Sequence, residues 1–510
     1  MKNTIAWITT VALAACASVD AGSPSARAKV GRRAPAVTAS ASGWTEVITP
    51  HLIIHTDLSA QKAGERGVEF EKLFSSVLDL GFKSQTPPVD PIEVILFRNN
   101  DDFHAFAPTK WAGGYTTFFD DQPRLVFPAE IGEQERSTFR HELTHRFVAY
   151  FIPGSPTWLN EGMACFYETM TVVRSEATIG ESKFNFSRTA TGVGRGNLID
   201  IESLPSASAL VAMSPSQFYS KSASDVDKSY AASWLLVSML MTGPDDDRTR
   251  FWSYLKSIAQ GAVPKEAWRA SFSGVDLDSA LHEYGKKGRI GVARVPYRPT
   301  VLDADSFQVR AMGEDDVHIL FATLSRGNKA RANSEIDKAL AAAPKSANAQ
   351  YWAGRFAVMS QDSAAAEEHF KNAVALAPDD PRDVYALAEL LFTAELAKPE
   401  SERNLAALQP QIDIIARLDK SSSAQNTVAW YYAITHQPDQ GMPFAVRSLQ
   451  LKPLCWECLD TAALLTFEKG DAAGAAVIER KAIGVFPHGA PKELLQALAK
   501  YEAQANPPQQ

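Results

Sequence analysis

Residues 141–168 read HELTHRFVAYFIPGSPTWLNEGMACFYE, and the first five of them have the pattern H-E-x-x-H. In an α-helix, positions i and i+4 lie about 40° apart around the axis and one turn apart along it. His141 and His145 can therefore point two imidazole nitrogens at one metal ion. Glu142 is rotated by about 100° from His141, beside the ion, where a carboxylate can take a proton from a water on the metal.

The opposite face of this helix predicts packing against a core. It carries four apolar or aromatic side chains at helical spacing: Phe139, Leu143, Phe147 and Tyr150. The histidine face must then look into a second layer or a cleft. The pentad alone is weak evidence, because a chain with 10 histidines in 510 residues matches H-E-x-x-H by chance in roughly one case in a hundred.

A third ligand follows after a break in the helix. The segment PGSP (153–156) ends the first helix, and Ser155 and Pro156 are expected at the N-cap and first position of a second helix. This helix, TWLNEGMACFYE, would return Glu161 to the open side of the ion. Gly162 lowers helix propensity by about 1 kcal/mol relative to Ala, which makes sense if two helices approach closely there. Two neutral histidines, one carboxylate and a water form the open arrangement of a hydrolytic zinc ion, with a net charge of about +1.

The H-E-x-x-H pattern followed by P-x-W-L-x-E-G-x-A resembles the gluzincin metallopeptidases, especially the bacterial peptidase MA-like family, which is often joined to tetratricopeptide repeats. The resemblance covers roughly residues 44–285 within an expected peptidase domain at 44–290. It implies an α+β, thermolysin-like domain of a small sheet and helices, with His141, His145 and Glu161 as ligands of Zn²⁺. It also implies that Glu142 is the general base and later the proton donor to the leaving amine.

Two positions depart from the family pattern. Thermolysin-like members carry an acid four residues after the glutamate ligand to orient a zinc histidine, and here that position is Cys165. Glu168, at i+7 and on nearly the same face, is a substitute, although an exposed charged residue is the favoured interpretation. For the oxyanion stabiliser, Tyr230 is a candidate because such families tend to place a tyrosine at the head of a later helix. The alternative for Tyr230 is a core-packing role.

The segment before the pentad predicts a short sheet. HLIIHT (51–56) and PIEVILF (91–97) have strand patterns and flank a helical pattern at about 60–80. GGYTTFFD (113–120) and PRLVFP (123–128) follow as a predicted hairpin. By the resemblance, one of these two strands would be the sheet edge that holds a peptide substrate as an added strand. Downstream, the pattern is mainly helical to about residue 288.

The N-terminus predicts export. Residues 1–22, MKNTIAWITTVALAACASVDAG, contain an apolar run that is too short to span a bilayer but suits a secretory signal. The four residues ending at Cys16 resemble a bacterial lipobox, which implies removal of residues 1–15, a lipid on Cys16 and a periplasmic, outer-membrane lipoprotein. The alternative is an ordinary signal cleaved after Ala28. Residues 16–43 lack apolar periodicity and predict a flexible tether.

The C-terminal part predicts a helical repeat. Pro344 and Pro378 are 34 residues apart, as are Pro453 and Pro487. Small residues keep the same register at Ala332, Ala339, Gly354, Ala366, Ala373, Ala388, Ala429, Gly441, Ser448, Ala463, Ala475 and Ala482. This period resembles the tetratricopeptide repeat, whose paired helices need small residues where their backbones approach. About five repeats fit an all-α solenoid at 313–505. The solenoid is expected to end in a capping helix, PKELLQALAKYEAQ, and an insertion within AKPESER (397–403) restores the repeat register. Residues 291–312 are expected to be a linker.

The remaining features restrict the function. A length of 510 residues predicts two to four domains, and a net charge of -8 without a basic block argues against nucleic-acid binding. Cys455 and Cys458 form a CWEC pair that an oxidising compartment would allow to bridge, although adjacency on a helix is the favoured interpretation. We expect a zinc-dependent peptidase of the cell envelope whose repeats recruit a substrate or a protein partner. The alternatives are a non-enzymatic scaffold with a vestigial metal site and a zinc hydrolase of non-peptide amides.

Overall fold

The computed structural model describes residues 43–83, 91–108, 114–119, 122–128, 130–182, 184–187, 198–219, 223–286, 291–300, 302–453, 455–485 and 491–505. The expected signal peptide, the lipidation site Cys16 and the tether up to residue 42 lie outside them. The described residues fall into two compact units that divide between Met312 and Gly313. In the part of the chain described, no helix is long and apolar enough to cross a membrane.

A six-stranded mixed sheet organises the first unit, in the order β11-β1-β2-β3-β5-β4. Strands β2, β3 and β5 are parallel, whereas β1 and β4 pair antiparallel with β2 and β5, and β11 pairs antiparallel with β1. The strand and helix patterns expected at 51–56, 91–97 and 60–80 correspond to β2, β3 and the first helix, and the expected hairpin is β4 and β5. The strands are β1 Thr45–Ile48, β2 Leu52–Thr56, β3 Ile92–Phe97, β4 Tyr115–Phe119, β5 Gln122–Pro128 and β11 Gln308–Ala311.

Each parallel strand is followed by a helix: α1 (Ala60–Phe82), α2 (Asn100–Phe106) and α3 (Glu133–Phe151). The rings of Phe70 and Phe139 pack 4.6 Å apart between α1 and α3, and Phe70 also contacts Phe127 of β5. The face of α3 that carries Phe139 is therefore buried as expected. Tyr150 was expected on the same apolar stripe but is 50% exposed. In the last turn of α3 the core contact is made by Phe151, whose ring centroid lies 5.1 Å from that of Phe82.

A helical layer follows the sheet. Helix α4 starts at Thr157 with Pro156 as its N-cap, one residue later than the pattern predicted. Helix α4 packs against both α3 and α7. At Gly162 an added Cβ would lie 2.6 Å from a backbone oxygen of α7, so the close approach inferred from this glycine is with α7. The helices are α4 Thr157–Glu168, α5 Ala207–Ala212, α6 Pro215–Phe218, α7 Ala223–Thr242, α8 Asp245–Ala259, α9 Pro264–Phe272 and α10 Leu277–Lys286, with the 3₁₀ turns η1 Ile201–Ser203 and η2 Ala304–Ser306.

The expected linker at 291–312 is wrong. Within it, β10 (Ala293–Pro296) pairs with β7 (Glu176–Ile179), which also pairs with β6 (Thr171–Val173). Strand β11 completes the main sheet beside β1, and Arg310 of β11 places Nε 2.6 Å from Oε1 of Glu46 on β1. These edge strands are short and polar and are held by backbone hydrogen bonds, so hydrophobic periodicity could not identify them. A further parallel pair is β8 (Asn185–Ser187) with β9 (Leu198–Asp200).

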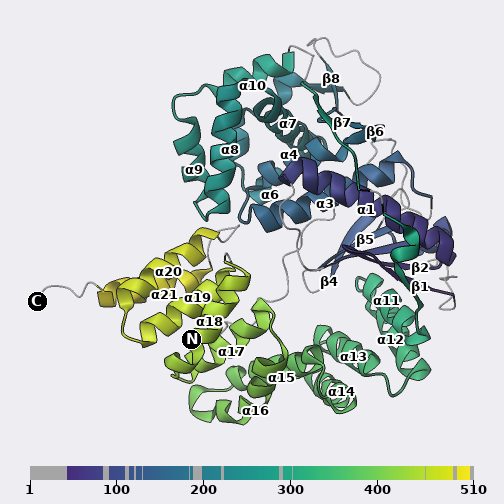
Figure 1. The fold of residues 1–510 in the computed structure, drawn as a ribbon. Coiled ribbons are helices and arrows are strands. Elements are labelled where there is room, and N and C mark those ends of the chain that lie inside the picture. Colours follow the sequence, from purple (N-terminus) through teal and green to yellow (C-terminus); the bar gives the residue numbers. More distant parts are fainter. Residues whose placement is uncertain are drawn as a thin grey trace, which may run out of the picture. The chain divides into compact units, whose positions relative to one another are not determined.

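The second unit is an α-solenoid of consecutive helix pairs, as the 34-residue period predicts (Figure 1). All of the small residues at the repeat positions are buried. At Gly354 an added Cβ would lie 2.5 Å from the ring of Phe370, which explains the need for a small residue there. A longer α15 and two 3₁₀ turns accommodate the expected insertion. The elements are α11 Glu314–Leu324, α12 Lys329–Ala342, α13 Ala347–Met359, α14 Ser363–Leu376, α15 Pro381–Ala397, η3 Glu400–Glu402, η4 Leu405–Leu408, α16 Gln409–Leu418, α17 Ser422–Ile434, α18 Pro438–Leu451, α19 Trp456–Glu468, α20 Ala472–Val485 and the final helix α21 Lys492–Ala505.

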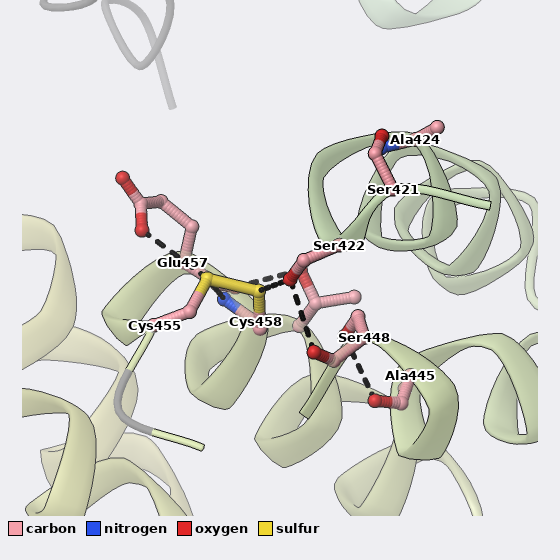
Figure 2. The surroundings of a disulfide bond; sticks show 9 residues. Ser421, Ser422, Ala424, Ala445, Ser448, Cys455, Glu457 and Cys458 are labelled. Carbon is pink, nitrogen blue, oxygen red and sulfur yellow. Dashed lines mark hydrogen bonds between the residues drawn. A yellow bond between two sulfur atoms is a disulfide. The ribbon is translucent and has the colours of Figure 1, made fainter. Parts of the chain in front are cut away.

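A disulfide joins Cys455 and Cys458 at the start of α19. Figure 2 shows the bond next to Ser422 and Ser448, with the hydroxyl of Ser422 donating to the backbone oxygen of Ser448 at 3.0 Å. Cys455 is the N-cap of α19 and its sulfur accepts a hydrogen bond from the backbone N–H of Cys458. The favoured interpretation of simple adjacency on a helix is therefore wrong, because Cys455 precedes the helix in extended backbone. Cys165 is free and buried.

Candidate metal centre

Helix α3 presents both histidines of the pentad on one face. The rings of His141 and His145 lie edge to face with centroids 4.6 Å apart. His141 is buried and His145 is half-buried. Gly132 is the N-cap of α3, and its backbone N–H donates to the carboxylate of Glu135 at 2.8 Å. Because the apolar face of the helix packs on α1, the core sets the rotation of the histidine face.

Glu161 of α4 completes the group. Its Oε2 lies 3.5 Å from Nε2 of His141 and 3.4 Å from Nε2 of His145. Glu161 is only 2% exposed, and its Oε2 makes no hydrogen bond of normal geometry to the described residues. The three ligand atoms lie within 4.8 Å of one another. Two imidazole nitrogens and one carboxylate oxygen converging in this way fit the donor set of a hydrolytic zinc ion.

The charge state of Glu161 fits such a site. Burial raises the pKa of this carboxyl group, but the adjacent imidazoles of His145 and His141 outweigh it and hold the pKa well below its usual range. A buried carboxylate that stays ionised needs positive charge beside it. A divalent cation held between neutral imidazoles would supply that charge.

The other nitrogen of each histidine has its own acceptor. Nδ1 of His141 lies 2.8 Å from Oε2 of Glu168, and Nδ1 of His145 lies 3.0 Å from Oδ1 of Asn160. When Nδ1 donates to these oxygens, Nε2 is left with the lone pair that a metal requires. Asn160 was not identified from the sequence, where it is one polar residue among several on α4.

The interpretation of Glu168 as an exposed charge is wrong. Its side chain is buried, with 3% of the residue exposed, and its backbone oxygen accepts a hydrogen bond from Nε of Arg140 at 2.8 Å. This hydrogen bond holds the last turn of α4 against α3. The sequence pattern gives no signal for such a contact between helices. Cys165, where an orienting acid was expected, is 1% exposed, and its sulfur belongs with His141 and Glu168 to a second group of atoms within 4.8 Å.

A tyrosine other than the expected one reaches the site. The hydroxyl of Tyr219 donates to Oε1 of Glu161 at 2.5 Å. Tyr230 lies inside α7, is half-buried, and packs edge to face on Phe218 with ring centroids 5.5 Å apart. Its role as an oxyanion donor stays a prediction. Tyr219 follows a four-residue helix 58 residues beyond Glu161, where no local pattern indicates a contact with the site.

Glu142 lies between the two histidines in the sequence of α3 and is half-buried. Among the residues that the structure describes, no hydrogen bond or ion pair occupies its carboxylate. Of the two strands considered for the substrate edge, β5 lies between β3 and β4, whereas β4 is the last strand of the sheet. Of these two strands, β4 therefore has the edge, among the described residues, to which a peptide strand can be added.

A cleft of about 580 Å³ opens at the start of α3. Its lining includes Arg66 of α1, His104 of α2 and Glu135 of α3, and contains none of the three ligand residues. Glu135 precedes His141 by six residues, or about 9 Å along a helix. The cleft and the group of His141, His145 and Glu161 are therefore separate features of the first unit.

Comparison with known proteins finds no matching family model and no matching curated protein. Similar solved structures include YrrB, a tetratricopeptide-repeat protein with an unusual peptide-binding site, at 21% identity over 36% of this chain and 91% of that chain, with a TM-score of 0.30. A tetratricopeptide-repeat protein of Thermus thermophilus is 19% identical over 38% of this chain and 98% of its own, with a TM-score of 0.29. PilF of Pseudomonas aeruginosa is 16% identical over 38% of this chain and 93% of its own, with a TM-score of 0.30.

Proposed function

We propose that the first unit is a zinc-dependent peptidase of the cell envelope and that the solenoid recruits its substrate or a protein partner. The observation that carries the proposal is the convergence of Nε2 of His141, Nε2 of His145 and Oε2 of Glu161 on one point. A thermolysin-like arrangement, implied by the sequence resemblance, accounts for this ligand order and for the sheet beside it. The N-terminal lipobox pattern supports a lipid anchor at Cys16 and a periplasmic, outer-membrane location.

Each residue of the site has a role in the proposed reaction. A zinc ion held by these ligands would supply Lewis acidity to a carbonyl group and acidify a nearby water. Glu142 takes the proton of the attacking water and returns it to the leaving amine. Glu168 and Asn160 keep the two histidines in the tautomer that leaves Nε2 unprotonated.

The substrate of this reaction is a peptide in extended form. The edge of β4 offers backbone donors and acceptors along five residues, so a peptide can join the sheet as an added strand. The solenoid can supply a second binding surface for a longer substrate or a partner protein. Hydrolysis of a non-peptide amide would use the same ligands and the same base.

A non-enzymatic scaffold is the alternative favoured by the solenoid itself, which accounts for about two fifths of the chain's length. Repeat stacks commonly act as binding surfaces without chemistry of their own. In that case the metal group would be vestigial or structural. A structural site does not require a carboxylate beside the ligands, and the unoccupied carboxylate of Glu142 therefore favours the enzyme.

The test combines metal content with proteolysis in the full chain. The wild-type protein should hold about one zinc ion, and His145→Ala should lose it. Glu142→Gln should retain the zinc and lower the rate of peptide hydrolysis by a factor of about 100 or more. Glu65→Gln, which removes an exposed carboxylate of α1, is the control and should leave the rate unchanged.

Two results would contradict the proposal. Undiminished hydrolysis by Glu142→Gln would remove the assigned base. Failure of the purified protein to take up zinc would support the scaffold. A screen of peptides and non-peptide amides against the wild type, with Glu142→Gln as the blank, identifies the bond that is cleaved.

A further inference from the structure

The two carboxylate oxygens of Glu161 have different surroundings. Oε2 faces the two imidazole Nε2 atoms at 3.4 and 3.5 Å. Oε1 accepts a hydrogen bond of 2.5 Å from the hydroxyl of Tyr219. We propose that Tyr219 is a positioning residue of the metal centre, which holds Oε1 away from the ion so that Glu161 binds through Oε2 alone. This inference rests on the proposed zinc site.

The position of the Tyr219 hydroxyl is built into the fold. Ser214 and Gln217 form a capping box at the start of α6, and the backbone N–H of Tyr219 donates to the oxygen of Pro215 at 3.0 Å. Phe218, the residue before it, is 1% exposed in the core and contacts the Tyr219 ring edge to face, with centroids 5.2 Å apart. The phenol is therefore in place without any ligand bound.

A fixed donor on Oε1 has a chemical consequence for the metal. A carboxylate with two unoccupied oxygens can bind an ion through both of them, whereas one whose Oε1 accepts a strong hydrogen bond binds through the other. Binding through one oxygen keeps the coordination number low and leaves a position for water and substrate, as hydrolytic sites require. Tyr219 thus acts on the geometry of the ion through Glu161, not on the substrate.

Replacement of the hydroxyl tests the inference. Tyr219→Phe retains the ring and removes the donor, which allows Oε1 to reach the ion. Co²⁺ is the spectroscopic probe, because its visible absorption weakens as the coordination number rises from four or five to six. In the metal-stripped full chain reloaded with Co²⁺, we expect Tyr219→Phe to absorb more weakly than the wild type. We also expect its Zn²⁺ affinity to fall by about 10–100-fold, the usual effect of removing a hydrogen bond to a ligand.

Tyr254→Phe is the matched control. Tyr254 is a buried tyrosine that also packs on α4, through Trp158, and its hydroxyl makes no hydrogen bond to the described residues. Its replacement should leave both the Co²⁺ spectrum and the Zn²⁺ affinity unchanged. Ser214→Ala, which breaks the capping box of α6, is a second variant that displaces Tyr219 while retaining its hydroxyl, and it should change the spectrum in the same direction.

The outcomes separate this inference from the proposed function. If the wild type binds no metal, the metal centre fails and the inference fails with it. If the wild type binds one ion and Tyr219→Phe matches it in both spectrum and affinity, the centre stands and the role of Tyr219 is refuted. If Tyr219→Phe does not fold, as judged by circular dichroism, the Ser214→Ala spectrum decides: no change refutes the role, and weaker absorption supports it.

Discussion

Replacing Glu168 by Gln should weaken zinc binding by about 10–100-fold. The carboxylate of Glu168 lies 2.8 Å from Nδ1 of His141 and the residue is only 3% exposed. A hydrogen bond to a charged group contributes about 1.5–3 kcal/mol, and each 1.4 kcal/mol corresponds to about a tenfold change in affinity. Gln keeps the shape and one acceptor oxygen, so we expect the lower half of this range for Glu168→Gln and the upper half for Glu168→Ala.

The assay is competition for Zn²⁺ between the protein and a chelator of known affinity. Cys165→Ser is the control. Cys165 occupies the position where the sequence resemblance leads us to expect an acid, and its replacement should leave the affinity unchanged if Glu168 has that role. The sulfur of Cys165 belongs to the same group of atoms as His141 and Glu168, within 4.8 Å. Cys165→Asp in the Glu168→Gln background should therefore recover part of the lost affinity.

Equal zinc affinities for the wild type and Glu168→Gln would refute the orienting role of this carboxylate. Folding has to be checked separately, since a buried charge is removed. The hydrogen bond from Arg140 to the backbone oxygen of Glu168 does not involve the side chain. The last turn of α4 should thus stay closed in the variant, and its metal-free melting curve should remain cooperative.

Three further expectations concern packing, pH and the disulfide. Gly162→Ala should destabilise the first unit by about 1–3 kcal/mol, because its Cβ would lie 2.6 Å from a backbone oxygen of α7. Gly327→Ala, whose Cβ meets open space, is the control. Equal melting temperatures for Gly162→Ala and the wild type would contradict the close packing at Gly162. Burial, together with the neighbouring Asp460 carboxylate, raises the pKa of Glu479 from 4.5 to about 8. Between pH 4.5 and about pH 8 the folded state therefore keeps a proton that the unfolded chain has lost, and the free energy of unfolding falls as the pH rises through this range. Glu479→Gln should stabilise the solenoid by roughly 1–3 kcal/mol above pH 8, and an unchanged pH profile of the urea midpoint would speak against this. Reducing the disulfide at the start of α19 opens a loop with a sequence separation of 3 and should lower the free energy of unfolding of the solenoid by about 2 kcal/mol. Identical urea midpoints with and without a reductant would exclude that contribution.

Helical geometry made the convergence of His141, His145 and Glu161 predictable from the sequence. The i, i+4 spacing placed His141 and His145 on one face, and the break at PGSP (153–156) allowed Glu161 to return beside them. The same geometry placed Glu168 close to the face of Glu161, since seven residues complete about two turns. Its burial depends on a contact between the end of α4 and Arg140, and such tertiary contacts leave no local pattern.

Contacts between distant segments were the part that could not be predicted. Tyr219 reaches Glu161 from a short helix whose sequence carries no periodic signal, and β10 and β11 join their sheets through backbone hydrogen bonds. The solenoid was easier to predict from the sequence, because its small residues repeat at fixed distances and each repeat contacts its neighbours. Sequence periodicity thus predicted elements and repeats, whereas the partners of isolated polar residues required the structure.

The burial of Glu168 changes the charge balance of the proposed centre. Two neutral imidazoles, a divalent ion and Glu161 alone would leave a net charge of about +1 in a buried site. The carboxylate of Glu168, 2.8 Å from His141, brings the sum to about zero and removes the cost of burying an uncompensated charge. A neutral centre acidifies a nearby water less than a cationic one, because the pKa of the water depends on the total charge around it. The proposed reaction would then depend more strongly on Glu142 as the base. We therefore expect the double variant Glu142→Gln/Glu168→Gln to retain more activity than Glu142→Gln alone when both are measured at saturating zinc.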